Sequence, residues 1–314
     1  MEDSYKIVFF YYTQTGQTLS IARQIAEPLV SAGAQVVYKE IVPEEPYPFP
    51  WSSDSFFQVF PESRLAIPCQ LKPIDLSDIQ DADLVVIAGQ SWYLSHSIPL
   101  HGFYQSDAIR SYLKGRKVVT VDGCRNMWVM KQLKTREYLY QCGATYVGSI
   151  VLQDMNPNLV SVITIVRWLF YNKKEATRWL PAAGVSPADI KQSARFGELL
   201  LGALKEDSFD SLQKKLMDTD AIKFIPSIYF IEKNGFRLWG NWARYILKKA
   251  PQPGEKRKPY LRIFMYYLFF VLYVISPFGW LFFFLTYPFR RASLKKARHE
   301  MCYELGWSEN QTIQ

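Results

Sequence analysis

The sequence predicts a doubly wound α/β fold with a parallel five-stranded sheet, followed by a helical, membrane-associated extension at the C-terminal end. Apolar runs typical of buried strands alternate with segments of helical periodicity over residues 1–152. This alternation stops after residue 152, and residues 153–250 are predicted to be mostly helical. Residues 263–289, within a third segment at 251–314, carry no charged side chain and are long enough to cross a bilayer.

Composition narrows the classes of function. The chain has 314 residues, of which 49% are hydrophobic and 16% aromatic, and a formal net charge of +8. The four cysteines share no metal-binding spacing and there are only three histidines, so we expect no metal site. The short acidic start, Met1 to Ser4, predicts no signal peptide, and a reducing cytoplasm fits the cysteines. Basic residues cluster around the C-terminal apolar segment, so we expect a membrane partner and no nucleic acid.

Each element of the predicted fold is assigned from periodicity and from breaker residues. The strands are predicted at 7–12, 35–38, 84–88, 117–121 and 146–152, and the helices from Thr18, then at 103–113, 127–142, 159–171 and 186–204. Residues 225–231 fit a helix or a strand. Residues 43–73 form an insertion in which prolines forbid a long helix and aromatics argue against a solvated linker, so we expect a packed irregular segment with a short helix at 54–60. This insertion either covers a sheet edge or forms a wall over a pocket for an apolar substrate.

The turn after the first strand has the composition of an anion site. It reads Thr13-Gln14-Thr15-Gly16-Gln17-Thr18, and it joins a strand to a helix N-terminus. Free N–H groups and the positive end of the helix dipole favour a phosphate there, and threonine hydroxyls add donors. The turn lacks the lysine of a P-loop and the spaced glycines of a dinucleotide fingerprint. The plain alternative is an ordinary strand-to-helix turn with a cap.

Two further loops follow the third and fourth strands, where ligands bind in open α/β sheets. One contains Ser91-Trp92-Tyr93-Leu94, and the other contains Gly123, Cys124, Arg125, Asn126 and Trp128. A flat isoalloxazine ring needs stacking surfaces and donors around its pyrimidine edge, and these loops carry both. The alternative is that Trp92 and Trp128 are ordinary core aromatics. Cys124 is either a thiolate beside Arg125 or an inert turn cysteine, and we favour the inert form.

These motifs resemble a known group of proteins. The turn at 13–18, together with Gly89, Tyr93 and Pro99 at their spacing, is similar to the flavodoxins and the NAD(P)H-dependent FMN reductases over the first half of the chain. The resemblance implies a flavodoxin-like fold and FMN as the cofactor. It assigns FMN to the three loops described above.

A narrower resemblance covers more of the chain. Five stretches resemble the bacterial dialkylresorcinol condensing enzyme family: 46–57, 60–63, 67–69, 123–130 and 158–169. That family belongs to pathways for resorcinol lipids and flexirubin-type pigments. The resemblance implies a flavodoxin-like aromatase that acts beside a ketosynthase partner and oxidises a lipid-like dialkylcyclohexanedione to a dialkylresorcinol. Condensation by this chain itself is disfavoured, because a ketosynthase needs a nucleophilic cysteine with positioned histidines.

The chemistry of aromatisation suggests roles for particular side chains. Arg125 is expected to hold the developing enolate, and Asn126 to bond the flavin or a substrate carbonyl. Tyr93 or His96 is expected to move the proton, with His96 ranked first because it follows the proposed flavin loop. The alternative for His96 is a capping or solvent-exposed role.

The apolar segment at 263–289 has basic clusters on both sides, at 256–262 and 290–298. Pro277-Phe278-Gly279 divides it into two halves that are each too short to span a bilayer. A re-entrant hairpin with both ends in the cytoplasm accounts for both features. A single tilted span and a buried pair of soluble helices are the alternatives.

The sequence therefore predicts a cytoplasmic FMN-dependent oxidoreductase attached to the inner membrane. Two other classes stay open: a membrane-tethered flavodoxin-type electron carrier or NAD(P)H-dependent FMN reductase, and a cofactor-free partner of the ketosynthase. The insertion at 43–73 favours the enzyme, because a carrier needs an exposed flavin edge.

Overall fold

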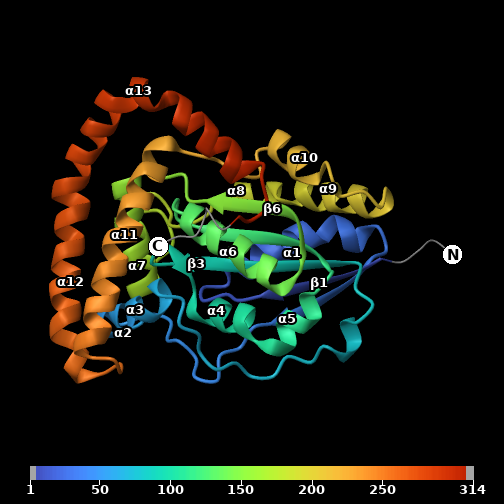
Figure 1. Ribbon diagram of the computed structural model, residues 1–314, viewed down its shortest axis with the longest axis horizontal. Helices are drawn as coiled ribbons and strands as arrows, with labels where there is room; N and C mark the ends of the chain where they lie inside the picture. The colour runs from blue at the N-terminus through green and yellow to red at the C-terminus, as the bar shows by residue number, and fades with distance from the viewer. Residues whose placement is uncertain (1–4, 309–314) are drawn as a thin grey trace.

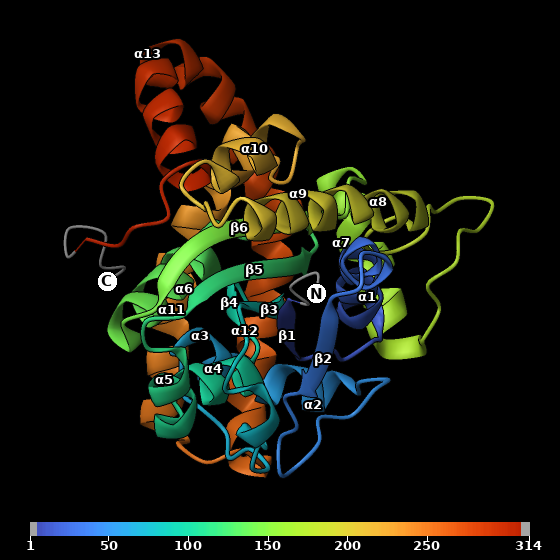
Figure 2. The same ribbon diagram turned by 90° about the vertical axis from the view of Figure 1, so that its right-hand side faces the viewer.

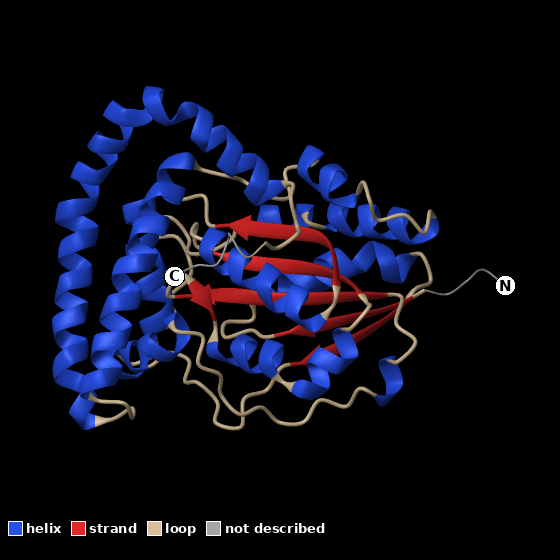
Figure 3. Cartoon of the chain, viewed as in Figure 1, coloured by secondary structure: helices blue, strands red, loops and turns tan. Residues whose placement is uncertain are grey.

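The computed structural model describes residues 5–308 and contains the predicted parallel sheet (Figures 1 and 3). Five parallel strands lie in the order β2-β1-β3-β5-β6, which is the flavodoxin-like arrangement. Their bounds are β1 Lys6–Tyr11, β2 Gln35–Glu40, β3 Leu84–Trp92, β5 Lys117–Cys124 and β6 Thr145–Gln153. The two-residue strand β4, Ser95–His96, folds back antiparallel against the end of β3.

Helices cover both faces of the sheet (Figure 2). Successive residues of β1 alternate between the faces: Ile7 and Phe9 belong to one hydrophobic cluster, and Val8 and Phe10 to the other. The first face is covered by α1 Gln17–Ser31, α9 Ala194–Lys205 and α10 Leu212–Asp218; the second is covered by α4 Ile98–Gln105, α5 Asp107–Leu113 and most of α6 Val129–Cys142. Because both faces are buried, the strands read as continuous apolar runs.

The core continues past residue 152. Helix α9 packs closely on α1, and a Cβ atom at Gly197 would meet the Ile25 carbonyl oxygen at 1.9 Å, so only glycine fits this contact. Phe196 and Leu200 of α9 share a hydrophobic cluster with Ile25 and Leu29 of α1. Residues after 152 therefore contribute to the same hydrophobic core as α1.

Several predicted helices have different bounds in the structure. The helix predicted at 103–113 is two helices, α4 and α5, because Ser106 adopts an extended conformation between them. The helix predicted at 186–204 is divided at Ser193 into α8 Pro187–Gln192 and α9. The ambiguous residues 225–231 are helical and begin α11 Pro226–Lys249. The remaining short elements are the 3-10 turns Ser77–Ile79 and Glu255–Arg257.

The insertion at 43–73 is a packed segment that holds the C-terminal helices. It contains α2 Ser53–Gln58, with a capping box at Ser52, and α3 Phe60–Arg64. Phe57 and Phe60 form a third hydrophobic cluster with residues of α11 and α12 Lys258–Phe270. The rings of Phe60 and Phe264 are stacked with their centroids 3.9 Å apart. The insertion thus joins the sheet to the C-terminal apolar segment.

The C-terminal apolar segment is one long bent helix, so the predicted hairpin is wrong in its geometry. Helix α12 continues through the π-helical segment Val271–Ile275 into α13 Ser276–Cys302, without a turn at Pro277 to Gly279. Pro277 has no N–H to give to the helical ladder and directly follows the π-helical segment, and these two features commonly bend a helix that continues. Figure 1 shows the helix rising beside α11 and then turning back over the α/β domain.

Both ends of this helix contact the α/β part of the chain. At the first end, the buried Arg257 donates to the carbonyl oxygen of Gln58 in the insertion. At the other end, Arg136 of α6 donates to the carbonyl oxygens of Glu300 and Met301, at 3.0 Å each. The helix between them is mostly exposed: only 17% of its most apolar window is buried, which disfavours the buried soluble helix pair.

Candidate functional site

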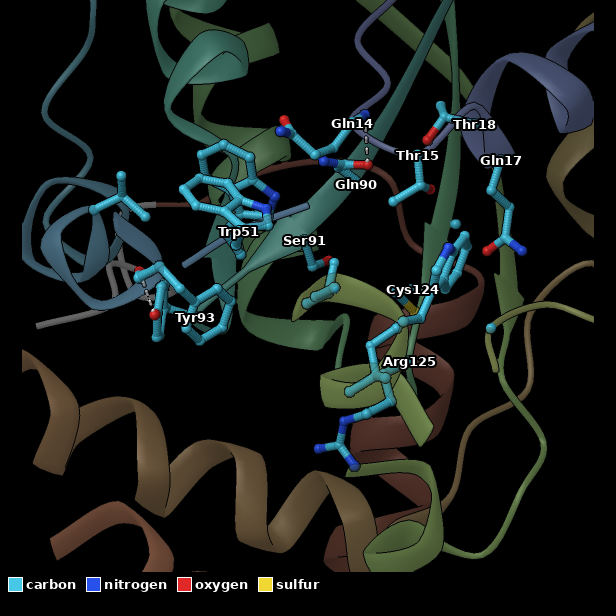
Figure 4. A pocket seen from close by; sticks show the side chains of 18 residues that line it. Gln14, Thr15, Gln17, Thr18, Trp51, Gln90, Ser91, Tyr93, Cys124 and Arg125 are labelled. Carbon is cyan, nitrogen blue, oxygen red and sulfur yellow. Dashed lines mark hydrogen bonds between the residues drawn. The ribbon is translucent and has the colours of Figure 1, made fainter. Parts of the chain in front are cut away.

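A cleft of about 220 Å³ lies at the carboxyl ends of β1, β3 and β5 (Figure 4). This is the point where the chain, having placed β2 on one side of β1, returns to place β3 on the other. The three loops singled out in the sequence all contribute to the lining: Gln14, Thr15, Gln17 and Thr18; Gln90, Ser91, Trp92 and Tyr93; and Gly123, Cys124 and Arg125.

The turn after β1 has the predicted form of an anion site. Gly16 adopts φ +81°, a left-handed conformation that glycine tolerates best, and it immediately precedes α1. No side chain caps this helix, so the N–H groups of its first turn keep their capacity for an external acceptor. Thr15 and Thr18 line the cleft beside them, and the buried Thr13 hydroxyl has no hydrogen-bond partner. These features fit a bound phosphate.

Glutamine side chains fix this turn to its surroundings. The backbone N–H of Gln14 donates to Gln90 Oε1. The side-chain Nε2 of Gln14 donates to the Pro48 carbonyl oxygen at 2.8 Å. Gln17 exchanges two hydrogen bonds with the backbone of Val185. The turn is therefore held by the next sheet loop, by the insertion and by the segment before α8.

The loop after β3 is a strained two-residue turn. Trp92 pairs with Ser95, and the two residues between them, Tyr93 and Leu94, have φ of 48° and 63°. Such values favour Asn or Gly, so a tyrosine and a leucine in this turn hold strain that the surrounding packing must overcome. The turn presents the Tyr93 ring to the cleft, while Leu94 is buried.

Tyr93 is poorly suited to move a proton. Its hydroxyl donates to the Phe56 carbonyl oxygen at 2.7 Å. Burial raises the pKa of Tyr93 well above its ordinary value. The tyrosine is therefore neutral and engaged as a donor, and its ring forms part of the wall between the cleft and the insertion.

Arg125 is the only charged residue that lines the cleft in the described part of the chain. It extends from the end of β5 toward α7, Asn158–Tyr171, where its guanidinium donates to Asn158 Oδ1 at 2.7 Å and to Ser161 Oγ at 3.1 Å. Burial lowers the pKa of Arg125 to about 10, so the side chain stays cationic at neutral pH. The cleft therefore holds one positive charge for an anionic group.

The other predicted residues of this loop have different places. Burial raises the pKa of the Cys124 thiol, so the side chain lines the cleft as an inert thiol. Asn126 donates to Asn158 and supports the N-terminus of α7 without lining the cleft. Trp128 is 2% exposed and belongs to the core, which agrees with the alternative that it is an ordinary core aromatic. Trp92, by contrast, lines the cleft.

His96 does not lie at the cleft, which corrects its predicted role as the base. The turn at 93–94 reverses the chain, so His96 in β4 lies in a buried cluster with His101, Tyr104 and Tyr138. Its Nε2 atom is 3.1 Å from the Thr135 hydroxyl. Burial lowers the pKa of His96 well below its ordinary value, so the ring is neutral and structural.

Two segments distant in sequence close over the cleft. The Trp51 N–H of the insertion donates to the Leu169 carbonyl oxygen of α7 at 2.8 Å. Phe56 of the insertion contacts Phe170 of α7 edge-on, with ring centroids 5.3 Å apart. Ile165, Trp168 and Leu169 of α7 line the cleft, and sequence reasoning missed them as site residues. The available signal was that all three residues fall within the stretch 158–169, one of those that carry the family resemblance.

No metal site accompanies the cleft. Within residues 5–308, no group of three His, Cys, Asp or Glu side chains is placed to hold a metal ion. The donor set of the cleft consists instead of amides, hydroxyls and one guanidinium.

No protein-family model matches this sequence, and no curated protein is significantly similar to it. Solved structures with a similar fold include a flavodoxin from Megasphaera elsdenii, at 17% identity over 48% of this chain and 89% of that protein, with a TM-score of 0.34. A flavoprotein from Lactobacillus acidophilus in complex with FMN is 15% identical over 47% of this chain and 93% of that protein, with a TM-score of 0.38. An azoreductase from Bacillus anthracis is 12% identical over 62% and 98%, with a TM-score of 0.34.

On its own strand order and cleft, the chain is an α/β protein of the flavodoxin-like class. It has two additions to a flavodoxin-like α/β domain. One is the roof that the insertion and α7 form over the cleft, and the other is the long apolar helix, which contacts the domain at both of its ends.

Proposed function

We propose that the protein is an FMN-dependent oxidoreductase that aromatises a cyclic diketone carrying alkyl chains. The observation that carries this proposal is the roofed cleft at the strand-order reversal, with a hydroxyl-rich turn at one end and one half-buried guanidinium at the other.

The residues of the cleft fit FMN. Its phosphate would be held by the first-turn N–H groups of α1 and by the hydroxyls of Thr15 and Thr18. The buried Thr13 hydroxyl, which has no protein partner, is a further donor within the same turn. The ring would lie between the Trp92–Tyr93 turn and the Gly123–Cys124 backbone.

Aromatisation requires the removal of two hydrogens from the diketone ring. One carbon-bound hydrogen leaves as a hydride and a neighbouring one leaves as a proton, after which keto–enol tautomerisation gives the two hydroxyls of a resorcinol. Bound FMN would supply the two-electron acceptor for the hydride. The protein supplies the position of the ring and the stabilisation of its negative charge.

Arg125 is the residue that would hold the enolate form of the diketone. It is cationic and half-buried, and Asn158 and Ser161 fix its guanidinium in one orientation. A cation held in this way stabilises the enolate oxygen and makes the neighbouring C–H bond easier to ionise. Ser91 Oγ is shielded from solvent and has no hydrogen-bond partner among the described residues, and Ser91 lines the cleft, so this hydroxyl is available to help move the proton off the ring.

The roof favours an enzyme over an electron carrier. A carrier exchanges electrons through an exposed flavin edge, but here Trp51 and Leu169 are hydrogen-bonded across the cleft. The carrier or NAD(P)H-dependent reductase remains the second candidate, since the phosphate turn serves it equally well. The third, a cofactor-free partner of a ketosynthase, shares the fold and lacks the flavin. A ketosynthase that delivers the diketone is the partner we propose for the enzyme.

We place the protein at the cytoplasmic face of the inner membrane. The middle of the long helix exposes large apolar side chains such as Phe278, Leu285 and Phe289, and basic residues flank it on both sides. Since both ends are tied to the same domain, this geometry favours a bent helix that lies in one leaflet, with its basic flanks on anionic headgroups.

The experiment is an anaerobic single turnover of the FMN-loaded, full-length protein with a 2,5-dialkylcyclohexane-1,3-dione, without NAD(P)H. The flavin absorbance is expected to bleach as the resorcinol forms. Arg125→Gln is expected to keep FMN and to slow bleaching by at least about tenfold, because it loses a charge-assisted bond to the enolate. A flavin that stays oxidised with the diketone but is reduced by NADPH would instead establish the carrier or reductase.

A further inference from the structure

A second cavity of about 270 Å³ lies behind the cleft. Its lining comes from six parts of the chain: the insertion, the strained turn, the loop after β5, α7, α11 and the C-terminal helix around its π-helical segment. Almost all of this lining is apolar, and Arg125 is its only charged member in the described residues. The cavity is therefore suited to a hydrocarbon group.

The second cavity adjoins the cleft. The two share a set of lining residues at their junction, namely Phe56, Ser91, Tyr93, Arg125 and Ile165. A molecule that spans the junction would place polar groups beside the hydroxyls and amides of the cleft, a negative charge at Arg125, and an apolar tail behind them. That description fits an amphiphile with an anionic ring and a linear chain.

The far wall of the second cavity is the apolar C-terminal helix. Leu268, Val271 and Leu272 face the cavity, whereas Phe270 and Val274 on the same helix are 54% and 44% exposed. One helix thickness therefore separates the cavity from the exposed apolar face. The wall includes the π-helical segment, whose extra residue per turn marks a weak place in a helix and is frequent at functional sites.

We propose that the second cavity binds a linear alkyl chain of the substrate, while its ring lies in the cleft against Arg125. This inference rests on the proposed function, because it names the class of substrate for the same site: a lipid-like cyclic diketone with a chain long enough to reach the C-terminal helix at its π-helical segment. The alkyl chain of the substrate is apolar, as the interior of a bilayer is. The exposed outer face of the same helix is apolar too.

Gly235 of α11 offers a way to fill the cavity without disturbing the fold. It lines the cavity, and a Cβ atom there would meet only Leu94 at 3.5 Å, an ordinary contact. Gly235→Leu should therefore be tolerated, and replacing a helical glycine favours the helix. Val166→Trp fills the same cavity from the α7 wall. Gly202→Leu is the matched control, since it is also a helical glycine but has nothing within 4 Å of its Cβ position.

The test compares 2-methyl- and 2-octylcyclohexane-1,3-dione as probes for the full-length protein in lipid nanodiscs, with binding followed by tryptophan fluorescence. Partition of the probes into lipid is the same for every variant and cancels in the comparison. Each buried methylene changes affinity by about fourfold. Both filled variants are expected to bind the octyl probe at least about tenfold more weakly than the parent, with the methyl probe and FMN unchanged. Gly202→Leu is expected to match the parent.

Two results separate this inference from the proposed function. If the filled variants bind the octyl probe as the parent does, while the flavin still bleaches with the diketone, the alkyl-chain site is overturned and the proposed function stands. If FMN fails to bind but the filled variants still lose affinity for the octyl probe, the chain site stands and the flavin function falls.

Discussion

Thr15 and Thr18 provide the most local test of the phosphate turn. Both line the cleft beside the uncapped first turn of α1. Removal of both hydroxyls in Thr15→Ala with Thr18→Ala should weaken FMN binding by about 1–3 kcal/mol, because two bonds to a charged phosphate are lost. Quenching of flavin fluorescence during titration measures the change.

Ser20→Ala is the control for this double variant. The Ser20 hydroxyl lies one turn further along α1 and donates to the Gly16 carbonyl oxygen, outside the cleft lining. FMN affinity should be unchanged in this control. If the double variant binds FMN as tightly as the parent, the assignment of the FMN phosphate to this turn is contradicted.

Glu232 predicts a pH dependence of stability. This residue of α11 is 1% exposed; its Oε1 atom accepts the Met130 N–H at 2.8 Å and its Oε2 atom has no partner. Burial raises the pKa of Glu232 from 4.5 to about 7. The folded state therefore binds this proton more tightly than the unfolded state, so its stabilising contribution is complete below pH 4.5 and is lost as the pH rises through 7.

Thermal unfolding of the parent and of Glu232→Gln measures this effect. The glutamine side chain would keep an acceptor for the Met130 N–H and carry no charge. The two proteins should be equally stable near pH 4.5, and the parent should be less stable at pH 8 by on the order of 3 kcal/mol, which follows from about 1.4 kcal/mol per pKa unit. A stability difference that does not vary with pH would show that Glu232 does not titrate in this range.

At the residue scale, prediction from sequence succeeds where the chemistry is local. The turn at 13–18 needs only a strand, a glycine and a helix start in succession, and all three are visible in the sequence. The predicted role of His96 as the base is wrong because the position of His96 depends on the chain reversal at Tyr93 and Leu94. That turn lacks the Asn or Gly by which such a reversal is usually recognised in a sequence. Glu232 was missed because it comes from α11, about 100 residues away from the α6 backbone that it contacts.

The long C-terminal helix is tested at the scale of the element. Single cysteines at Lys256 and Lys295, in a protein without its four native cysteines, mark its two basic flanks; both sites are exposed. Because Arg257 and Arg136 tie the two ends to one domain, both sites should resist a membrane-impermeant thiol reagent in intact cells and react after lysis.

Reaction of one site from outside the cell would establish a single span. It would also mean that one of the two arginine contacts opens in the membrane. Reaction of both sites after lysis serves as the control that each cysteine is accessible.

At the element scale, the strands follow from their composition, but the bend of the C-terminal helix does not. The strands are continuous apolar runs because helices cover both faces. The residues Pro277 and Gly279 are compatible with a break between two helices and with a helix that continues, so the local sequence does not distinguish the two. In the structure the helix continues. The π-helical segment lines the second cavity, and no local pattern reveals this placement.

Removal of the C-terminal helix tests the molecule as a whole. Truncation after Gly254 would expose Phe57 and Phe60, which pack against Leu261, Phe264 and Leu268. Loss of the Phe264 side chain alone is worth about 3–5 kcal/mol in a packed core. The truncated protein should therefore leave the membrane but unfold at a lower temperature than the full chain and bind a dye for exposed apolar surface.

The full-length protein in detergent is the reference for this comparison. A truncated protein with an unchanged melting temperature and no dye binding would contradict the third cluster as a source of stability. It would make residues 5–254 an independent domain.

At the scale of the whole molecule, the shared core explains what could not be predicted. The loss of strand–helix alternation at residue 152 marks a change of pattern, but α9 still supplies the layer beside α1. The roof is also a tertiary feature, since Trp51 and Leu169 meet across more than a hundred residues of chain. Composition predicted an insertion that packs over either a sheet edge or a pocket; the fold shows that it lines the cleft and packs against the apolar helix.

The central claim, that the cleft holds FMN, is tested most directly by the visible spectrum of the freshly purified full-length protein with and without added FMN. The account predicts a flavin band in the protein as purified or, after titration, one bound FMN per chain, with its absorbance shifted from that of free FMN by the aromatic walls at Trp92 and Tyr93. A protein that carries no flavin, and that leaves the spectrum of added FMN unchanged at every concentration, would contradict the account and favour the cofactor-free partner.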